Sequence, residues 1–402
     1  MSQRFIAIQT GARRNYVIPS VLEHAGLLEV LYTDVCGDAG LGRALDLCCP
    51  PFLKRGGVAR LLNRRVPQNL RNKVRTVDLC AFRYAVRRYR AGDDQVNQYR
   101  ALSTYVDEFG RSLIKRGVGR ATHVFTTFGD GLPFLEVAKR EGLGIVADIY
   151  TSPLTYRIVE DEKRRYPGLE PFVPQQVIEA SRAWFEKFVS LVDVFVTPSS
   201  FVRRGLAEFG VPEAKCPLVP YSVDGSWLKT ACEPEKGRVL FAGTAGVGKG
   251  IHVLGMAAGR LAHRGYDFRV AGNVSDAVRR GGLTRGLNFL GRVPRARIRD
   301  EFSRADVFVL PTLAEGSAGA TYEALAAGVP VVTTEAAGSV VRDGVDGFII
   351  PTSDAEALAG RVEQLVEDRA LRERMSRAAR GRAREYTFER YAERLVEACR
   401  TA

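Results

Sequence analysis

Short apolar runs alternate with helical patterns in the second half of the chain. From residue 238 onward, the runs are separated by loops or by segments with apolar residues at helical spacing, as at Ile251, Leu254 and Leu261. Continuous apolar strands that alternate with helices are typical of a parallel sheet covered on both faces. We therefore predict strands over 239–242, 267–271, 287–290, 307–310 and 329–333.

The first half of the chain repeats this pattern less regularly. Periodicity then stops at 212–237, where proline and glycine cluster. We interpret 212–237 as the linker between two doubly wound α/β domains of similar size, and 354–402 as almost wholly helical. Two such domains would hold a ligand in the cleft between the carboxyl ends of their strands. The strands predicted for the first half are 5–8, 29–32, 123–126, 144–149 and 194–197, and its clearest helices are 175–191 and 199–209.

The composition excludes several classes of protein. The 402 residues are 46% hydrophobic and 26% charged, which is ordinary for a folded chain and excludes disorder, collagen and small disulfide scaffolds. The seven cysteines show no C-x-x-C spacing, so we expect reduced thiols in a cytosolic protein, without a disulfide framework or a cysteine zinc site. The four scattered histidines suggest no metal site, and no apolar run is long enough for a membrane-spanning helix or a signal peptide.

The positive charge is concentrated in one segment. The formal net charge is +13, and residues 51–90 hold twelve basic side chains against one acidic side chain, Asp78. We expect 51–90 to be a long helical insertion in the first domain. Such a segment either contacts anionic lipid headgroups, near a lipid-linked acceptor, or forms a solvated helical face. The basic balance also admits a nucleic-acid-binding protein, but the segment has few aromatic residues and no recognisable nucleic-acid-binding module, so we expect no nucleic acid partner.

A glycine-rich loop follows the predicted strand 239–242. The sequence GTAGVGKG, from Gly243 to Gly250, can bring backbone amides close to a phosphate at the start of a helix, and Lys249 adds a positive charge. The spacing satisfies G-x-x-x-x-G-K, so a P-loop nucleoside triphosphatase is one alternative. Against it, Gly250 stands where a P-loop has the Ser or Thr that binds Mg²⁺, and Asp306 precedes its strand instead of following it. The other alternative is a plain strand–helix turn with a surface lysine.

A second loop carries two glutamates. In EGSAGATYE, Glu315 would project from the loop after strand 307–310, and Glu323 would lie about one turn into the next helix. The residues between them, Gly316–Gly319, are small enough for their N–H groups to face an anion at the helix N-terminus. A carboxylate on each side of such a turn would be placed to bind a pair of sugar hydroxyls. The alternative is two ordinary glutamates on a solvated helix.

Together these motifs resemble a known family. EGSAGATYEALAAGVPVVTTEAAGSVVRDGVDGFIIP is similar to the E-x₇-E signature region of the family 4 retaining glycosyltransferases, and FAGTAGVGKG is similar to that family's donor-phosphate loop. LNFLGRV resembles its base-binding strand end and VPYSVDGSWL its interdomain segment, and VTPSSFVRRGLAEFGVP and YTFERYAERL also fit. The resemblance covers 190–402 well and 1–190 weakly.

The resemblance implies a GT-B fold, in which two Rossmann-like domains face each other across a cleft. It implies an acceptor-side domain over 1–220, a nucleotide-sugar domain over 221–384 and a last helix, 385–402, that crosses back. The implied reaction is retaining, metal-independent transfer of a sugar from a nucleoside diphosphate sugar, with UDP or GDP, to an acceptor hydroxyl. No separate cofactor is implied. The implied setting is polysaccharide or glycolipid synthesis in the cytoplasm, at the inner face of the plasma membrane.

The resemblance also implies roles for individual residues. Glu323 would bind the ribose hydroxyls, while Glu315, on the donor sugar, and Lys249, on the diphosphate, would be catalytic. Gly11, in the turn after the first strand, would face the diphosphate from the first domain. The remaining expected binding residues are Arg292 and Val293 near the base, and Thr244, Gly248, Gly316, Ser317, Ala318 and Gly319 near the diphosphate.

Two positions depart from the family pattern. Thr244 stands where family members usually carry an arginine, so the diphosphate loses one positive partner. The substitutes we consider are Arg13, Arg14 and Arg295. The family often has a histidine after the fourth strand of its first domain. Here HVFTTFGDG has His123 at the wrong end of the run and offers Thr126, Thr127 or Asp130 instead. Because no carboxylate is evidently placed as a nucleophile, we expect the acceptor hydroxyl to attack on the front face of the sugar.

Overall fold

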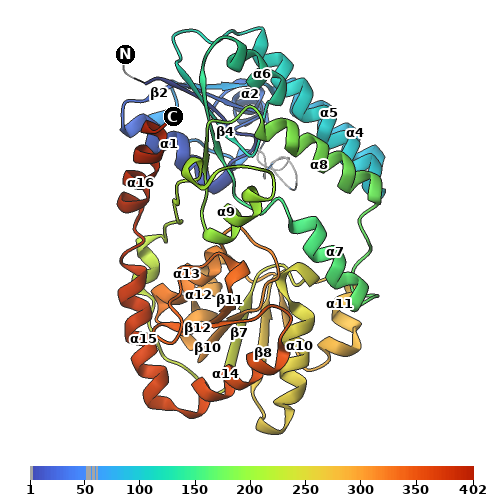
Figure 1. The fold of residues 1–402 in the computed structure, drawn as a ribbon, viewed down its shortest axis with the longest axis vertical. Coiled ribbons are helices and arrows are strands. Elements are labelled where there is room, and N and C mark those ends of the chain that lie inside the picture. The colour runs from blue at the N-terminus through green and yellow to red at the C-terminus, as the bar shows by residue number, and fades with distance from the viewer. Residues whose placement is uncertain (1–2, 51–55, 57–58, 60–61) are drawn as a thin grey trace.

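The computed structural model describes residues 3–50, 56, 59 and 62–402. Two α/β domains lie one above the other along the long axis of the molecule (Figure 1). Within the described residues, each domain holds a six-stranded parallel sheet, with strand orders β3-β2-β1-β4-β5-β6 and β12-β11-β10-β7-β8-β9. The predicted fold class, two doubly wound Rossmann-like domains, is confirmed.

The first domain alternates strands and helices from its N-terminus. The two middle strands of its sheet, β1 and β4, are buried along nearly their whole length because helices cover both faces. Its elements are β1 (Phe5–Ile8), α1 (Val17–His24), β2 (Leu28–Thr33), α2 (Gly40–Cys48), β3 (Val74–Thr76), α4 (Asp78–Ala91), α5 (Gln95–Ile114), β4 (His123–Thr127), α6 (Leu132–Arg140), β5 (Gly144–Asp148), α7 (Thr155–Arg165), α8 (Gln175–Val189), β6 (Val194–Val196) and α9 (Ser200–Ala207), with short 3₁₀ turns η1 (Arg13–Tyr16) and η3 (Gln68–Leu70).

The second domain follows the same plan around a larger apolar core. Every residue of β10 is buried, as a central strand of a parallel sheet requires. Its elements are β7 (Arg238–Ala242), η6 (Val247–Lys249), α10 (Ile251–Arg260), β8 (Asp267–Ala271), α11 (Asp276–Arg280), β9 (Asn288–Gly291), α12 (Arg295–Arg304), β10 (Val307–Leu310), α13 (Gly319–Ala327), β11 (Val331–Thr334), β12 (Gly347–Ile350), α14 (Ala355–Glu367) and α15 (Arg369–Ala383).

The last helix, α16 (Phe388–Arg400), runs from the second domain back to the first (Figure 1). Its buried side chains Tyr391 and Leu395 join an apolar cluster that contains Phe5 of β1. The Gln3 side chain also donates a hydrogen bond to the Cys399 carbonyl at 3.1 Å. The two ends of the chain are thereby held against the same sheet.

The strands predicted from apolar runs are present, but two edge strands were missed. β3 has three residues, of which only Val74 is buried, so it leaves no recognisable period. β12 is a short strand at the other sheet's edge. β3 also corrects the prediction of a long helical insertion over 51–90, because a strand of the sheet interrupts the described part of that segment before the helix α4 begins at Asp78. Residues 51–55, 57–58 and 60–61 of that segment lie outside the described residues.

No helix in the described part of the chain combines the length and the apolarity that crossing a bilayer requires.

Candidate active site

The second sheet reverses its strand order between β7 and β10. From β7 the chain proceeds to β8 and β9 on one side, and β10 then pairs with β7 on the other side. In open α/β sheets, ligands bind where the loops at such a switch point separate. Here the loops 243–250 and 311–318 follow the two strands and are joined, because Thr312 Oγ1 and the Leu313 N–H both donate to the Gly248 carbonyl, at 2.7 and 2.9 Å.

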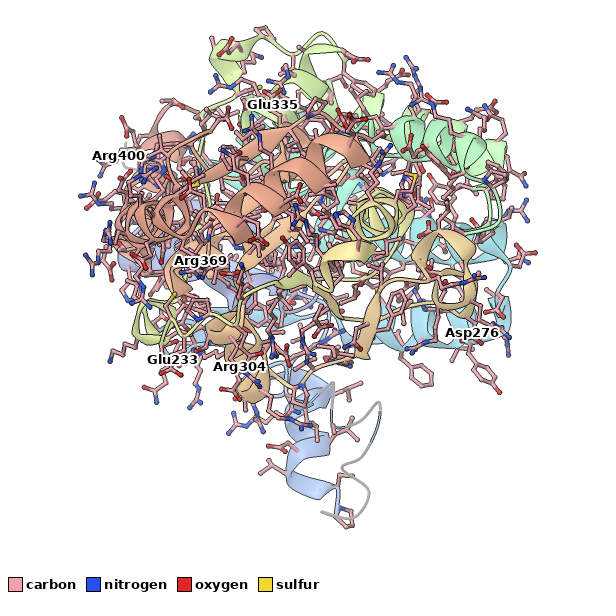
Figure 2. All side chains as sticks on the ribbon, turned by 90° about the horizontal axis from the view of Figure 1, so that it is seen from below. Glu233, Asp276, Arg304, Glu335, Arg369 and Arg400 are labelled. Carbon is pink, nitrogen blue, oxygen red and sulfur yellow. The ribbon has the colours of Figure 1, made fainter. Side chains whose placement is uncertain are left out.

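Gly250 tests the P-loop interpretation of the glycine-rich loop. Its φ is +71°, and a Cβ at this position would lie 1.9 Å from the Pro311 carbonyl oxygen. A Ser or Thr cannot occupy the position without separating the two loops, so the P-loop alternative does not fit. Asp306 also fails the P-loop pattern. It is fully buried at the amino end of β10, within 2.7 Å of Arg369 and 3.2 Å of Arg372. Arg369 is labelled in Figure 2, which views the molecule from below.

Lys249 and Glu315 meet at the switch point. Nζ of Lys249, at the end of η6, contacts Oε2 of Glu315, in the loop after β10, although both side chains remain partly exposed. Burial lowers the pKa of Lys249 to about 8, and the carboxylate in contact with it favours the charged ammonium form. The arrangement places one cation and one carboxylate side by side where two glycine-containing loops converge.

Glu323 lies one turn into α13, on the same side of the sheet. Burial raises the pKa of its carboxyl to about 7, although Arg295 and Arg299 of α12 lower it. Asp224 also raises this pKa. A half-buried carboxylate flanked by two arginines is held ready to accept hydrogen bonds from a ligand's hydroxyl groups.

The loop between the two glutamates is tied to the segment 335–338. The Glu315 and Ala318 N–H groups donate to the carbonyls of Ala336 and Ala337, both at 3.0 Å. The Ser317 hydroxyl donates to the Gly338 carbonyl at 2.9 Å. These bonds fix the loop, and they also correct our expectation for Ala318, because its amide is already committed and does not belong to a set of free anion-binding amides.

The first domain reaches this loop directly. A Cβ on Gly316 would lie 1.6 Å from the Tyr150 carbonyl oxygen, at the carboxyl end of β5. The Ser199 hydroxyl, at the start of α9, donates to the Gly316 carbonyl at 2.6 Å. The Arg13 guanidinium lies over the Tyr150 ring, 3.3 Å from its centroid. Residue 316 is therefore a glycine because the two domains approach each other at this point.

Comparison with known proteins supports one family. Residues 236–368 match the family described as glycosyl transferases group 1. The chain is 30% identical over 327 residues to D-inositol 3-phosphate glycosyltransferase of Paenarthrobacter aurescens, covering 75% of this chain and 78% of the relative. The chain belongs to the group 1 glycosyltransferases. It is also 28% identical over 251 residues to glycogen synthase of Mycobacterium tuberculosis. This match covers 59% of the present chain and 60% of the glycogen synthase, which is less than two thirds of that relative's length.

The same fold occurs among solved glycosyltransferases. This group 1 glycosyltransferase aligns with Anabaena HepE, a structure in complex with UDP and glucose, at a TM-score of 0.62 and 12% identity over the full length of both chains. At that identity the likeness shows the fold alone. The predicted GT-B fold is thereby confirmed.

Some of the residues predicted for the site of this glycosyltransferase meet at the switch point, and others lie exposed beside it. Lys249, Glu315 and Gly316 come together, with Glu323 on the adjoining helix. The exposed Thr244 side chain makes no hydrogen bond with any described residue, and Arg292 is likewise exposed, beside the half-buried Val293. Gly248 joins the two loops through its carbonyl, and Gly319 is the first residue of α13, so its N–H has no intrahelical partner.

The first domain has its own switch point, between β1 and β4, where Gly11 lies. The Gly11 N–H donates to Asp34 at 2.8 Å, so this amide is not free to face a diphosphate. Asp130 accepts from the N–H and the hydroxyl of Thr10, at 2.7 and 2.9 Å. Burial raises the pKa of Asp130 to about 6, although the hydrogen bonds from Thr10 lower it. The Thr126 hydroxyl is buried and donates to the Asp130 carbonyl at 2.9 Å, so of the three residues considered Thr126 is committed to the fold, and the Asp130 carboxyl lies beside Thr10 at the switch point.

In the turn after β1, shortly after Gly11, the three consecutive residues Arg14, Asn15 and Tyr16 have positive φ values of 47°, 53° and 58°. Such a run of left-handed non-glycine residues is costly and persists only where the surroundings hold it. Arg14 is held over the rings of Tyr221 and Tyr391, 3.9 and 4.6 Å from their centroids. Arg14 therefore packs between the domains, while Arg13 lies toward Gly316.

Sequence reasoning missed the contact made by Glu170. Its carboxylate, in the segment between α7 and α8, accepts from the Val247 N–H of the glycine-rich loop at 2.8 Å. Lys163 of α7 lies 3.7 Å from Glu170 and 2.7 Å from the buried Glu160. A further bond links Glu162 of α7 to His252 of α10, at 2.8 Å. No local pattern marks these residues, because each gains its role from a helix of one domain docking on the other.

Proposed function

We propose that this chain transfers a sugar from a nucleoside diphosphate sugar to an acceptor hydroxyl, with retention of the anomeric configuration and without a metal ion. The observation that carries the proposal is the contact of Lys249 with Glu315 at the switch point, with Glu323 one turn into the helix that follows Glu315. Cleavage of the sugar–phosphate bond develops negative charge on the leaving diphosphate, and a fixed cation stabilises that charge more in the transition state than in the ground state.

Each of the three side chains takes a distinct role. The Lys249 ammonium, together with the first-turn amides of α13, faces the leaving diphosphate. The Glu315 carboxylate accepts from hydroxyls of the transferred sugar and lies near the anomeric centre as that centre becomes positive. The Glu323 carboxylate accepts from the two ribose hydroxyls. The acceptor hydroxyl attacks on the front face and passes its proton to the departing phosphate oxygen.

Arg13 supplies the charge that Thr244 does not. Its guanidinium lies on the Tyr150 ring, and the Tyr150 carbonyl is against Gly316, beside Glu315. Among the three arginines considered, Arg14 is enclosed by two tyrosine rings and Arg295 lies beside Glu323. Arg13 is therefore the one that approaches the loop from the opposite domain.

The donor we propose carries UDP or GDP, and the likeness in fold to HepE, solved with UDP and glucose, favours UDP. The acceptor hydroxyl belongs to a glycolipid or a growing polysaccharide and enters from the side of the first domain, near Asp130. The setting we propose is polysaccharide or glycolipid synthesis in the cytoplasm.

The test is a thermal-shift screen with UDP-, GDP- and ADP-sugars, with ATP as the comparison. A donor present at a hundred times its Kd should stabilise the fold by about 2.7 kcal/mol. We expect one nucleoside diphosphate sugar to raise Tm and ATP not to do so. NMR of the product, formed in the presence of EDTA, should then show the donor's anomeric configuration. An inverted product or complete loss of turnover with EDTA would contradict the retaining, metal-independent part of the proposal.

A further inference from the structure

Helix α4 exposes a row of apolar side chains on the surface of the first domain. Leu79, Phe82 and Tyr89 are 56%, 65% and 89% exposed, and the half-buried Val86 lies between the latter two. At 3.6 residues per turn, the four side chains fall within a stripe about 80° wide. Aromatic and aliphatic side chains gathered on one exposed helix face mark an interaction surface.

The same helix is strongly basic. It contains four arginines and one acidic residue, Asp78. By helical spacing, Arg83 and Arg90 border the stripe on the side of Leu79. An amphipathic helix with an apolar stripe bordered by arginines has the pattern of helices that lie in the headgroup layer of a membrane.

A basic cavity adjoins this helix. α4 and α5 run side by side along one flank of the first domain (Figure 1), and the cavity, an open surface pocket of about 270 Å³, lies between them. Arg87, on its wall, is paired with Glu108. The guanidinium groups of Arg90 and Arg100 make no hydrogen bond or ion pair with any residue that the structure describes. The polar side chains that line the cavity are Arg87, Arg90, Asn97, Arg100 and Thr104.

The chemistry of this cavity suits an oxyanion. Two unpaired guanidinium groups, with the Asn97 amide beside them, offer several donors to a phosphate group, while the Thr104 hydroxyl already donates to the Arg100 carbonyl at 2.8 Å. The apolar stripe lies on α4, and the cavity lies beside it between α4 and α5, with Arg90 next to both. A phospholipid carries both complementary parts, a phosphate and acyl chains, whereas the phosphate backbone of a nucleic acid carries no apolar chains that would cover Leu79 and Val86.

We propose that the α4 face, meaning the stripe Leu79, Phe82, Val86 and Tyr89 with the cavity of Arg90 and Arg100, binds an anionic lipid surface. The apolar side chains enter the headgroup–acyl boundary, and the cavity takes the phosphate of an anionic lipid. This surface lies apart from the donor site, so the inference goes beyond the proposed reaction. Its test uses the protein without nucleotide, and its failure leaves the proposed reaction untouched.

The test is co-sedimentation of the full chain with phosphatidylcholine vesicles and with vesicles that also contain phosphatidylglycerol. We expect binding to the anionic vesicles only, weakening as salt is added. Each arginine near an anionic surface contributes a factor of about five, so Arg90→Gln with Arg100→Gln should lower partitioning about 30-fold. Phe82→Ser with Tyr89→Ser should lower it at least about tenfold at unchanged charge.

A matched control variant removes two arginine charges from a surface of the second domain. Arg374 and Arg377 are exposed on α15, in the second domain, and Arg374→Gln with Arg377→Gln should leave partitioning within about twofold of the wild type. Val345→Ser, at a 46% exposed apolar position of the same domain, controls for the stripe variants. Circular dichroism checks that every variant is folded.

Three results would overturn the inference. The first is equal or negligible binding of the wild type to both kinds of vesicle. The second is a loss in the α15 control as large as the loss in the Arg90 and Arg100 variant. The third is stabilisation of the wild type, but not of that variant, by inorganic phosphate or by single-stranded RNA without vesicle binding, which would make the cavity a site for a soluble anion.

Discussion

Replacing Glu323 with glutamine should stabilise the second domain at pH 8 while it weakens nucleotide binding. Burial raises the pKa of Glu323 from its ordinary value of 4.5 to about 7, so folding favours the neutral carboxyl group. The charged form therefore destabilises the folded state, and this penalty develops as pH rises from 4.5 to 7. A shift of this size corresponds to about 3 kcal/mol above pH 7 and to nothing below pH 4.5. Glutamine has a similar shape and no charge, so it avoids the penalty.

The measurement is chemical denaturation at several pH values between 4.5 and 8. The chain has two tryptophans, Trp184 and Trp227, and Trp227 is buried in the core of the second domain. A Trp184→Phe background makes Trp227 fluorescence a reporter of that domain alone. We expect Glu323→Gln to raise the free energy of unfolding by up to about 3 kcal/mol at pH 8, with the difference vanishing toward pH 4.5.

The same substitution tests the role of the carboxylate. A carboxylate can accept from both ribose hydroxyls, while the amide offers one acceptor oxygen. Losing a charge-assisted bond should weaken nucleoside diphosphate binding by about 1.5–3 kcal/mol, measured by isothermal titration, and raise KM for the donor. Wild-type affinity should increase as pH rises through 7, because the ionised form binds, and the variant's affinity should not change with pH.

The control and the refuting results separate the two parts of this reasoning. Glu356 is an exposed glutamate of α14. Glu356→Gln should leave the free energy of unfolding and the nucleotide affinity equal to those of the wild type at every pH. A stability difference that is the same at pH 4.5 and pH 8 would refute the burial argument. A pH-dependent stabilisation with unchanged nucleotide affinity would mean that Glu323 does not bind the nucleotide.

Three further predictions concern the loops at the switch point. Lys249→Ala should lower kcat by roughly 10²–10³, because it removes a cation aimed at the leaving group, and a loss of only a few-fold in steady-state assays would make Lys249 a surface residue. Glu315→Gln should lower kcat while the affinity for the free nucleoside diphosphate, measured by titration, stays nearly unchanged, because its contact strengthens only in the transition state. Gly316→Ala should reduce turnover and open the molecule in small-angle scattering, since its methyl group would meet the Tyr150 carbonyl. Gly319→Ala, where a Cβ has open space, is the matched control, and equal effects of both would refute the steric argument.

The sequence by itself determined the features that depend on short stretches of chain. Apolar runs locate the central strands because a strand of a parallel sheet is buried on both faces, whatever lies beside it. The spacing of Glu315 and Glu323 places one in a loop and one a turn into a helix, which is a local matter of helical geometry. The sequence shows that Gly250 departs from the P-loop pattern. It does not show why a glycine is needed there, which is the close approach of the Pro311 carbonyl.

Only the tertiary structure decided which of these stretches meet. Lys249 touches Glu315 because β7 and β10 pair across the switch point, and strand order follows from long-range packing that no local pattern records. The contacts of Gly316 with Tyr150 and of Glu170 with Val247 depend in turn on how one domain docks on the other. The short edge strand β3, with one buried residue, forms because a neighbouring strand already offers it hydrogen-bond partners. Local sequence specifies what each segment buries, while the identity of its neighbour is settled only when the whole chain has packed.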